Sequence, residues 1–176
     1  MTKVITGKVR MNYTNLFTPK AQEIFDEPKY SLSILIPKED KTTIENINEA
    51  IEKAKKKGQN IWGESIPNDF KIPLRDGDIE RSDSKDYEDH FFINASSKYK
   101  PGVVDKKLNE ITDSKEIYPG CYGRVSLNFF PFSKNGQVGI GCGINNVQKI
   151  CDGEVIAINS RPEDDFSVID DFEEIL

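Results

Sequence analysis

Alternation of apolar and polar residues, the pattern of a half-buried β-strand, recurs along this chain. Residues 5–13 place one alternating set inward and a polar, partly cationic set outward. The inward set is Ile5, Gly7, Val9, Met11 and Tyr13, and the outward set is Thr6, Lys8, Arg10 and Asn12. Residues 30–36 alternate in the same way until Pro37 ends the pattern. We predict further strands at 90–100, 121–132 and 137–149, and Asn135-Gly136 between the last two favours a hairpin.

One segment has helical periodicity instead. Asp40 is a typical N-cap, and four apolar residues follow it at helical spacing. They are Ile44, Ile47, Ile51 and Ala54. The run of lysines at 55–57 before Gly58 suits a helix C-terminus, although such a run could also contact phosphates. Residues 59–89 predict a long loop with room for a short helical turn, and 103–116 a polar connection. Five strands and one helix without a βαβ rhythm predict a mainly β, small barrel.

The net charge of −6 is distributed unevenly over the 176 residues. Residues 163–176 contain seven acidic residues and no basic one, which leaves 23 acidic residues against 24 Lys and Arg in the rest of the chain. A segment of this composition cannot bury enough apolar surface to fold alone. We therefore expect one domain at 1–162 and a disordered acidic tail at 163–176. The tail could occupy a cationic surface, dock on a partner through its apolar end, or only increase solubility.

Catalytic and metal-binding motifs are poorly represented. His90 is the only histidine, and the sequence has no CxxC pair and no P-loop, so we predict no cofactor and no resident metal. Three cysteines at irregular spacing favour buried thiols in a reducing cytoplasm. The sequence shows neither an apolar run of membrane-spanning length nor a signal peptide. Acidic residues crowd one loop, at Asp76, Asp78, Glu80 and Asp83. A metal-dependent nuclease or replication accessory protein that uses this loop is the alternative function, but the spacing matches no EF-hand and a solvated acidic loop is the better interpretation.

The segment 121–132 carries the most informative pattern. Val125, Leu127 and Phe129 form an apolar face. The opposite face combines Arg124, Ser126, Asn128, Phe130 and Phe132. Aromatic rings on a polar, cationic strand face are typical of single-stranded nucleic-acid binding, because rings stack on bases and cations neutralise phosphates. The alternative is that both outer phenylalanines pack under the long loop as a second small core.

The following strand supports the same interpretation. Gly139, Gly141 and Gly143 alternate with apolar residues and would leave its outer face bare. A bare face permits close approach of a ligand, although it also permits barrel curvature. Two tyrosines beside cations, Tyr99 between Lys98 and Lys100 and Tyr122 beside Arg124, add stacking and phosphate candidates. Lys8 and Arg10 share the outward face of the first strand. The predicted nucleic-acid-binding residues are Lys8, Arg10, Lys98, Tyr99, Lys100, Tyr122, Arg124, Asn128, Phe130 and Phe132.

Three blocks of the sequence resemble a known family. They are Tyr118-Pro-Gly-Cys-Tyr-Gly-Arg-Val125, Asn128-Phe-Phe-Pro-Phe132 and Gly143-Ile-Asn-Asn-Val-Gln-Lys149. They resemble an uncharacterised family from phages and prophages of Gram-positive bacteria, grouped with the short-tailed-phage type of single-stranded DNA-binding protein. The resemblance covers essentially the whole chain. It implies a five-stranded OB-type barrel with one inserted helix, binding without sequence preference, and a role in phage replication and recombination in the host cytoplasm.

The resemblance also implies a homodimer and a tail that engages replication proteins. Related tails commonly end in an aromatic residue, whereas this one ends in Ile175-Leu176 with Phe172 upstream. The predicted partner-binding residues are Phe172, Glu173, Glu174, Ile175 and Leu176. The identity of the anchoring residue stays open at this point, as does the alternative of a purely structural interaction protein.

Overall fold

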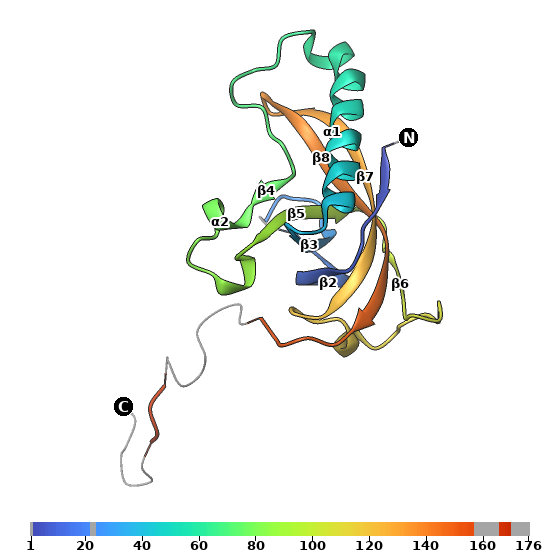
Figure 1. Cartoon of the computed structure of the whole chain (residues 1–176), viewed down its shortest axis with the longest axis vertical. Helices are drawn as coiled ribbons and strands as arrows, with labels where there is room; N and C mark the ends of the chain where they lie inside the picture. Colours follow the sequence, from blue (N-terminus) through green and yellow to red (C-terminus); the bar gives the residue numbers. More distant parts are fainter. Residues whose placement is uncertain (1, 22–23, 157–165, 170–176) are drawn as a thin grey trace.

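A computed structural model describes residues 2–21, 24–156 and 166–169 of the chain. The described chain is mainly β with one long helix, as the hydrophobic pattern predicts (Figure 1). Its strands are β1 (Lys3–Ile5), β2 (Val9–Lys20), β3 (Lys29–Pro37), β4 (Arg75–Asp76), β5 (His90–Ser97), β6 (Gly102–Val104), β7 (Tyr122–Lys134) and β8 (Gln137–Cys151). The helices are α1 (Lys41–Trp62) and α2 (Gly77–Glu80), with 3-10 turns η1 (Lys85–Tyr87) and η2 (Ser114–Glu116). None of the helices in the described ranges has both the length and the apolar character needed to cross a bilayer.

The strands form one sheet that curls back on itself. Its order is β1-β7-β2-β3-β5-β8-β6, and β7 also pairs with β8, so the path from β7 through β2, β3, β5 and β8 returns to its start. The barrel is closed unevenly, because β5 and β8 meet in parallel at the single pair Ser96 and Gly143. Further along, these two strands separate, and residues 71–76 bridge the seam. Lys71 pairs with Gly139 of β8, and β4 pairs with β5.

The predicted strand at 5–13 is interrupted, which corrects the sequence interpretation. Thr6 is buried rather than exposed, because its backbone N–H and side-chain hydroxyl both bond to Val125, while the N–H of Gly7 bonds to Thr43. Val9 and Met11 are buried as predicted. Tyr13 has a positive φ of 46°, which reverses the alternation and turns its ring outward at 41% exposure.

Two further residues of this segment differ from the prediction in side or in exposure. Ile5 is 55% exposed, since β1 aligns it with Ser126 on the outer face of β7. Asn12 is buried and donates a hydrogen bond to the hydroxyl of Tyr87. Ile5 therefore lies on the opposite side from the one predicted, whereas Asn12 keeps the predicted outer side, shared with its partner Ser33, and is covered there by Tyr87.

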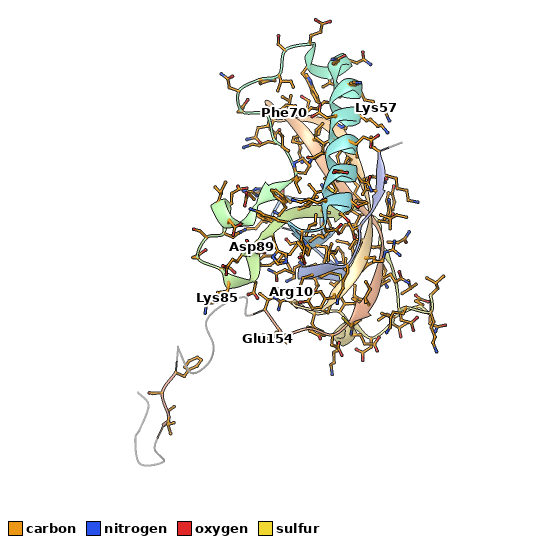
Figure 2. All side chains as sticks on the ribbon, viewed as in Figure 1. Arg10, Lys57, Phe70, Lys85, Asp89 and Glu154 are labelled. Atoms are coloured by element: carbon orange, nitrogen blue, oxygen red, sulfur yellow. The ribbon has the colours of Figure 1, made fainter. Side chains whose placement is uncertain are left out.

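Helix α1 begins as predicted, with the Asp40 carboxylate accepting from the Thr43 N–H at 3.2 Å. It extends beyond the predicted end at Gly58 and stops at Gly63, whose φ of 79° terminates the helix. Gly58 is buried because the ring of Trp62 lies where a side chain at position 58 would stand. Trp62 in turn packs edge-on against Phe70 at 5.2 Å between ring centres. Figures 1 and 2 show α1 standing along the β7–β8 hairpin, with Phe70 beside its C-terminal half.

The long loop predicted at 59–89 is more ordered than a loop. Besides the end of α1, it carries β4, α2 and η1. Tyr87 from this segment packs with Leu35 and Phe92 in a small second core on the outer face of β3 and β5. The main core fills the barrel and the space beneath α1 and includes Met11, Ile34, Ile47, Leu127 and Phe129. The segment therefore covers one part of the outer sheet face and leaves the adjoining part open.

Candidate nucleic-acid interface

The open part of the outer face of β2, β3 and β5 forms a groove of about 740 Å³. Its floor consists of small polar side chains that alternate with core residues along each strand. These are Asn15, Ser31, Ser33, Asn94 and Ser96. The registers place them side by side, because Ser31 pairs with both Asn15 and Ser96 while Ser33 pairs with Asn94. A floor of short side chains lets an extended polymer approach the sheet backbone closely.

Cations surround this floor. They come from four separate parts of the chain, namely Lys20 and Lys29, Arg81, Lys98 and Lys134. Asp26 and Glu27 are acidic residues in the same lining, and Glu27 pairs with Lys98 at 3.4 Å. Both side chains of that pair are about 60% exposed, so the ion pair is weak and a competing phosphate can replace it. The groove wall is thus cationic although the whole chain is acidic.

The outer face of the β7–β8 hairpin continues the groove. Phe130, Phe132 and Lys134 share this face by strand parity, and Lys134 lines the groove. Phe130 is 46% exposed, and its ring lies on Gly141, where an added Cβ would come within 2.5 Å of the ring. The glycine therefore supports the aromatic ring from below and leaves the other ring face accessible.

The predicted parity of β7 and most of β8 is confirmed. Phe129 is 2% exposed, while Phe130 lies on the outer face and does not join a second buried core. Gly139 differs from the predicted bare floor, since it is buried beneath the backbone of Lys71. Only Gly141 and Gly143 therefore lie on the open part of this face.

A row of paired residues connects the hairpin to the groove floor. Ser96 pairs with Gly143, which in turn pairs with Asn128 of β7. Asn128 donates a hydrogen bond to Asn145 at 2.8 Å, which holds its amide against the sheet. The outer face is consequently continuous from the groove to the exposed ring of Phe130.

The predicted residues after β5 lie at the end of the groove. The strand ends at Ser97, three residues earlier than predicted, so Lys98 to Lys100 follow it. Lys98 lines the groove, and the Tyr99 side chain is 82% exposed. The ammonium of Lys100 lies 5.8 Å from the ring centre of Phe17. These positions suit stacking and phosphate contacts at a groove entrance.

The other four predicted residues gather elsewhere, at the start of β7 and β2. Lys8 lies 4.8 Å from the ring centre of Tyr122, and Arg124 donates to the carbonyl of Thr6. Arg10 pairs with Asp86 at 2.7 Å and donates to the carbonyl of Glu154. Figure 2 shows Arg10 close to Glu154 at the lower end of the barrel. With a side chain only 13% exposed, Arg10 ties three segments together and is poorly placed for phosphate contact.

Sequence reasoning missed most of the groove lining. The missed residues are Tyr13, Asn15, Lys20, Lys29, Ser31, Ser33, Arg81, Asn94, Ser96 and Lys134. One available signal was the lysine at each end of the β2–β3 connection, since Lys20 and Lys29 pair across it. Another was Phe25 in that connection, whose side chain is 99% exposed. An aromatic residue in a polar loop between two cations is a stacking candidate in its own right.

Three of the four acidic residues of the loop pair with neighbouring cations. Lys38 contacts Asp76 at 2.8 Å and Asp78 at 2.7 Å, and its hydrogen bonds lower the pKa of both carboxyls. Glu80 pairs with Arg75 at 2.6 Å. Within the ranges that the structure describes, no three metal-ligating side chains converge. The loop geometry thus favours a structural role over a metal centre.

Comparison with known proteins supports the DNA-binding interpretation. A family model described as "Enterobacter phage Enc34, ssDNA-binding protein" matches residues 2–176. The single-stranded DNA-binding protein from bacteriophage Enc34 in complex with ssDNA is 25% identical, with a TM-score of 0.80 over 89% of this chain and 90% of that chain. Its C-terminal truncation is 26% identical, with a TM-score of 0.77 over 88% of each chain.

A more distant structure shares the fold. The single-stranded DNA-binding protein gp2.5 of bacteriophage T7 is 13% identical, with a TM-score of 0.65 over 92% of this chain and 98% of that chain. No curated protein sequence matches the chain. The resemblance to phage single-stranded DNA-binding proteins that the sequence blocks indicate is confirmed by the family match. The chain belongs to the family of the Enterobacter phage Enc34 ssDNA-binding protein.

Proposed function

We propose that this protein binds single-stranded DNA without sequence preference during phage DNA replication and recombination, and performs no chemistry on it. The observation that carries this proposal is the groove with a small polar floor and a cationic wall, continuous with the exposed ring of Phe130. Cations that follow a backbone and rings that stack on any base are the features of sequence-tolerant strand binding. The solved complex of the Enc34 relative with ssDNA supports it.

We also propose that the sheet is an OB-type barrel made by β2, β3, β5, β7 and β8. The closed pairing path and the parallel contact between β5 and β8 support this assignment. OB-folds are five-stranded, partly open barrels that bind oligonucleotides on one sheet face and its flanking loops. In this chain, that face would be the groove, and the flanking loops would be the β2–β3 connection and the tip of the β7–β8 hairpin.

The test of the proposed function is a titration with fluorescently labelled oligonucleotides. We expect anisotropy to rise with similar affinity for a dT oligomer and for a mixed-sequence oligomer of the same length. The label should also stay on intact oligonucleotide in magnesium and in EDTA. An unchanged anisotropy would refute DNA binding, and shortening of the oligonucleotide in magnesium alone would instead support the nuclease alternative.

The acidic segment 163–176 is proposed as a flexible tail that competes with DNA and recruits replication proteins. The proposed partner contacts at 172–176 lie outside the described residues. A tether keeps its seven negative charges at roughly millimolar effective concentration near the groove, so that even a weak contact is populated. We also propose that the protein is a homodimer and acts in the host cytoplasm. Sedimentation equilibrium tests the dimer by measuring the mass of the assembly.

Deletion of residues 163–176 should raise the affinity for single-stranded DNA. DNA must displace the tail before it binds, so the apparent affinity of the full chain is lowered in proportion to the fraction occupied. The gain should be largest at low salt, because salt screens exposed ionic contacts. Anisotropy titrations of the full chain and of residues 1–162 at two salt concentrations measure it.

The control for the deletion is a tail in which the seven acidic residues become the corresponding amides, with the length unchanged. It should reproduce the affinity gain of the deletion. Equal low-salt affinities for all three proteins would show that the tail does not occupy the groove.

A further inference from the structure

The seam between β5 and β8 contains a second hollow of about 480 Å³. It lies between the Ser96–Gly143 pair and the Lys71–Gly139 pair, where the two strands have separated. The bridging segment, residues 71–75, forms one side, and the edge of β8 at Gly141 and Cys142 forms the other. The hollow is thus a gap in the sheet between two points of closure.

This hollow adjoins the proposed DNA path on both sides. Asn94 lines the groove and also lines the seam hollow. Gly141 lines the seam hollow and also supports the ring of Phe130. A strand that runs from the groove floor to Phe130 would therefore cross the mouth of the hollow.

The lining has the composition that a flat heterocycle needs. Ile72, Pro73 and Leu74 provide an apolar side on which a base can stack. The Asn94 carbonyl accepts a hydrogen bond from Ser33, and within the described residues its amide nitrogen donates no hydrogen bond, so it can donate to a base carbonyl. Small-ligand sites typically combine an apolar lining with a few placed polar groups in this way.

The rim of the hollow provides one cation that can contact the sugar-phosphate backbone of the DNA. Arg75 is occupied by Glu80, with two nitrogen atoms donating to that carboxylate. Lys71 is exposed, and its backbone is held by Val138 and Ile140 of β8. Its side chain is therefore the rim group best placed to contact a phosphate next to a base inside the hollow.

We propose that the seam hollow is a nucleobase pocket that takes one base out of the strand between the groove and Phe130. This inference rests on the proposed function. It implies that one nucleotide of the bound strand is held differently from its neighbours, which are stacked on rings or lie over the polar floor. It also gives the bridging segment 71–75 a ligand-binding role besides closing the barrel.

The test is an abasic scan on the shortest dT oligomer that the full-length protein binds tightly. Each nucleotide in turn is replaced by an abasic residue, and affinity is measured by competition. Base contacts worth about 1–3 kcal/mol correspond to a loss of about 5- to 150-fold at one position, above the losses at the other positions. The Ile72→Trp variant should fill the hollow, so it should weaken binding of the intact oligomer and remove the penalty at that position.

Two further variants complete the design. Ile66→Trp adds the same ring to another half-exposed isoleucine that does not line the hollow, and it should keep the wild-type abasic profile. Asn94→Ala should reduce the position-specific penalty even if Ile72→Trp does not fold. A uniform abasic profile, or a position-specific penalty that is unchanged in both pocket variants, would overturn the nucleobase pocket. The proposed function would still stand in that case, provided that the wild-type protein binds the dT oligomer without abasic residues. Failure of the wild-type protein to bind the intact oligomer would refute the proposed function itself.

Discussion

Replacement of Phe129 by alanine should lower the free energy of unfolding by about 3–5 kcal/mol, the range for deleting a buried aromatic side chain. Phe129 is 2% exposed in the main core, and it pairs with the buried Cys142 across the β7–β8 ladder. Its neighbour Phe130 should behave in the opposite way. Phe130→Ala should leave unfolding nearly unchanged and weaken binding of single-stranded DNA by about 1–3 kcal/mol, the value of one stacked base.

Chemical denaturation and anisotropy titration measure the two effects separately. Phe132→Ala is the matched control, because Phe132 lies on the same face as Phe130 but is half-buried opposite Gly139. We expect it to lose some stability and some affinity. A Phe129→Ala protein of normal stability, together with an unstable Phe130→Ala protein, would mean that the faces of β7 are exchanged and that the proposed interface is on the wrong side.

The contrast between these neighbours was predictable from the sequence, and other features were not. Along β7 every second residue is apolar, so strand periodicity alone assigns Phe129 to the core. The same periodicity gave a wrong result near the N-terminus, where alternation continues through residues 6–8. There the buried hydroxyl of Thr6 caps the N–H of Val125, which is a long-range interaction that local pattern does not reveal.

The end of α1 illustrates the second kind of limit. Three lysines followed by Gly58 resemble a helix C-terminus, and local propensity favours stopping there. The structure continues for another turn because the ring of Trp62 uses the space that Gly58 leaves and packs against Phe70. The glycine is therefore explained by tertiary packing, which outweighs its cost inside a helix.

The groove was hidden for a third reason. Its floor residues are ordinary small polar residues on three different strands, and none is distinctive in its own segment. They gain meaning only when the registers align Ser31 with Asn15 and Ser96 and bring Lys134 from a hairpin a hundred residues away. Residue type predicted the chemistry of the interface, but strand order was needed to locate it.

Neutralising the groove should have the largest effect on DNA affinity. The variant Lys20→Gln, Lys29→Gln, Lys98→Gln removes three of the lining cations and leaves a flexible, neutral polar side chain at each position. Each phosphate contact on a single strand contributes about 0.7 to the slope of log affinity against log salt. The magnitude of the slope should therefore fall by about 2, and affinity near 50 mM salt should drop by roughly two to three orders of magnitude. Titrations at four or more salt concentrations give both values.

A variant with the same change of net charge is needed to separate local contacts from the overall field. Lys41→Gln, Lys56→Gln, Lys57→Gln removes three exposed cations from α1, none of which lines the groove. Because charges beyond about 10 Å are largely screened near 0.1 M salt, this variant should keep most of the wild-type slope. Equal losses in the two triple variants would mean that the strand follows α1 or that only net charge matters. A salt slope in the groove variant equal to that of the wild type would mean that the phosphates contact the surface around Lys8 and Arg124 instead. In that case Lys8→Gln and Arg124→Gln should reduce the slope.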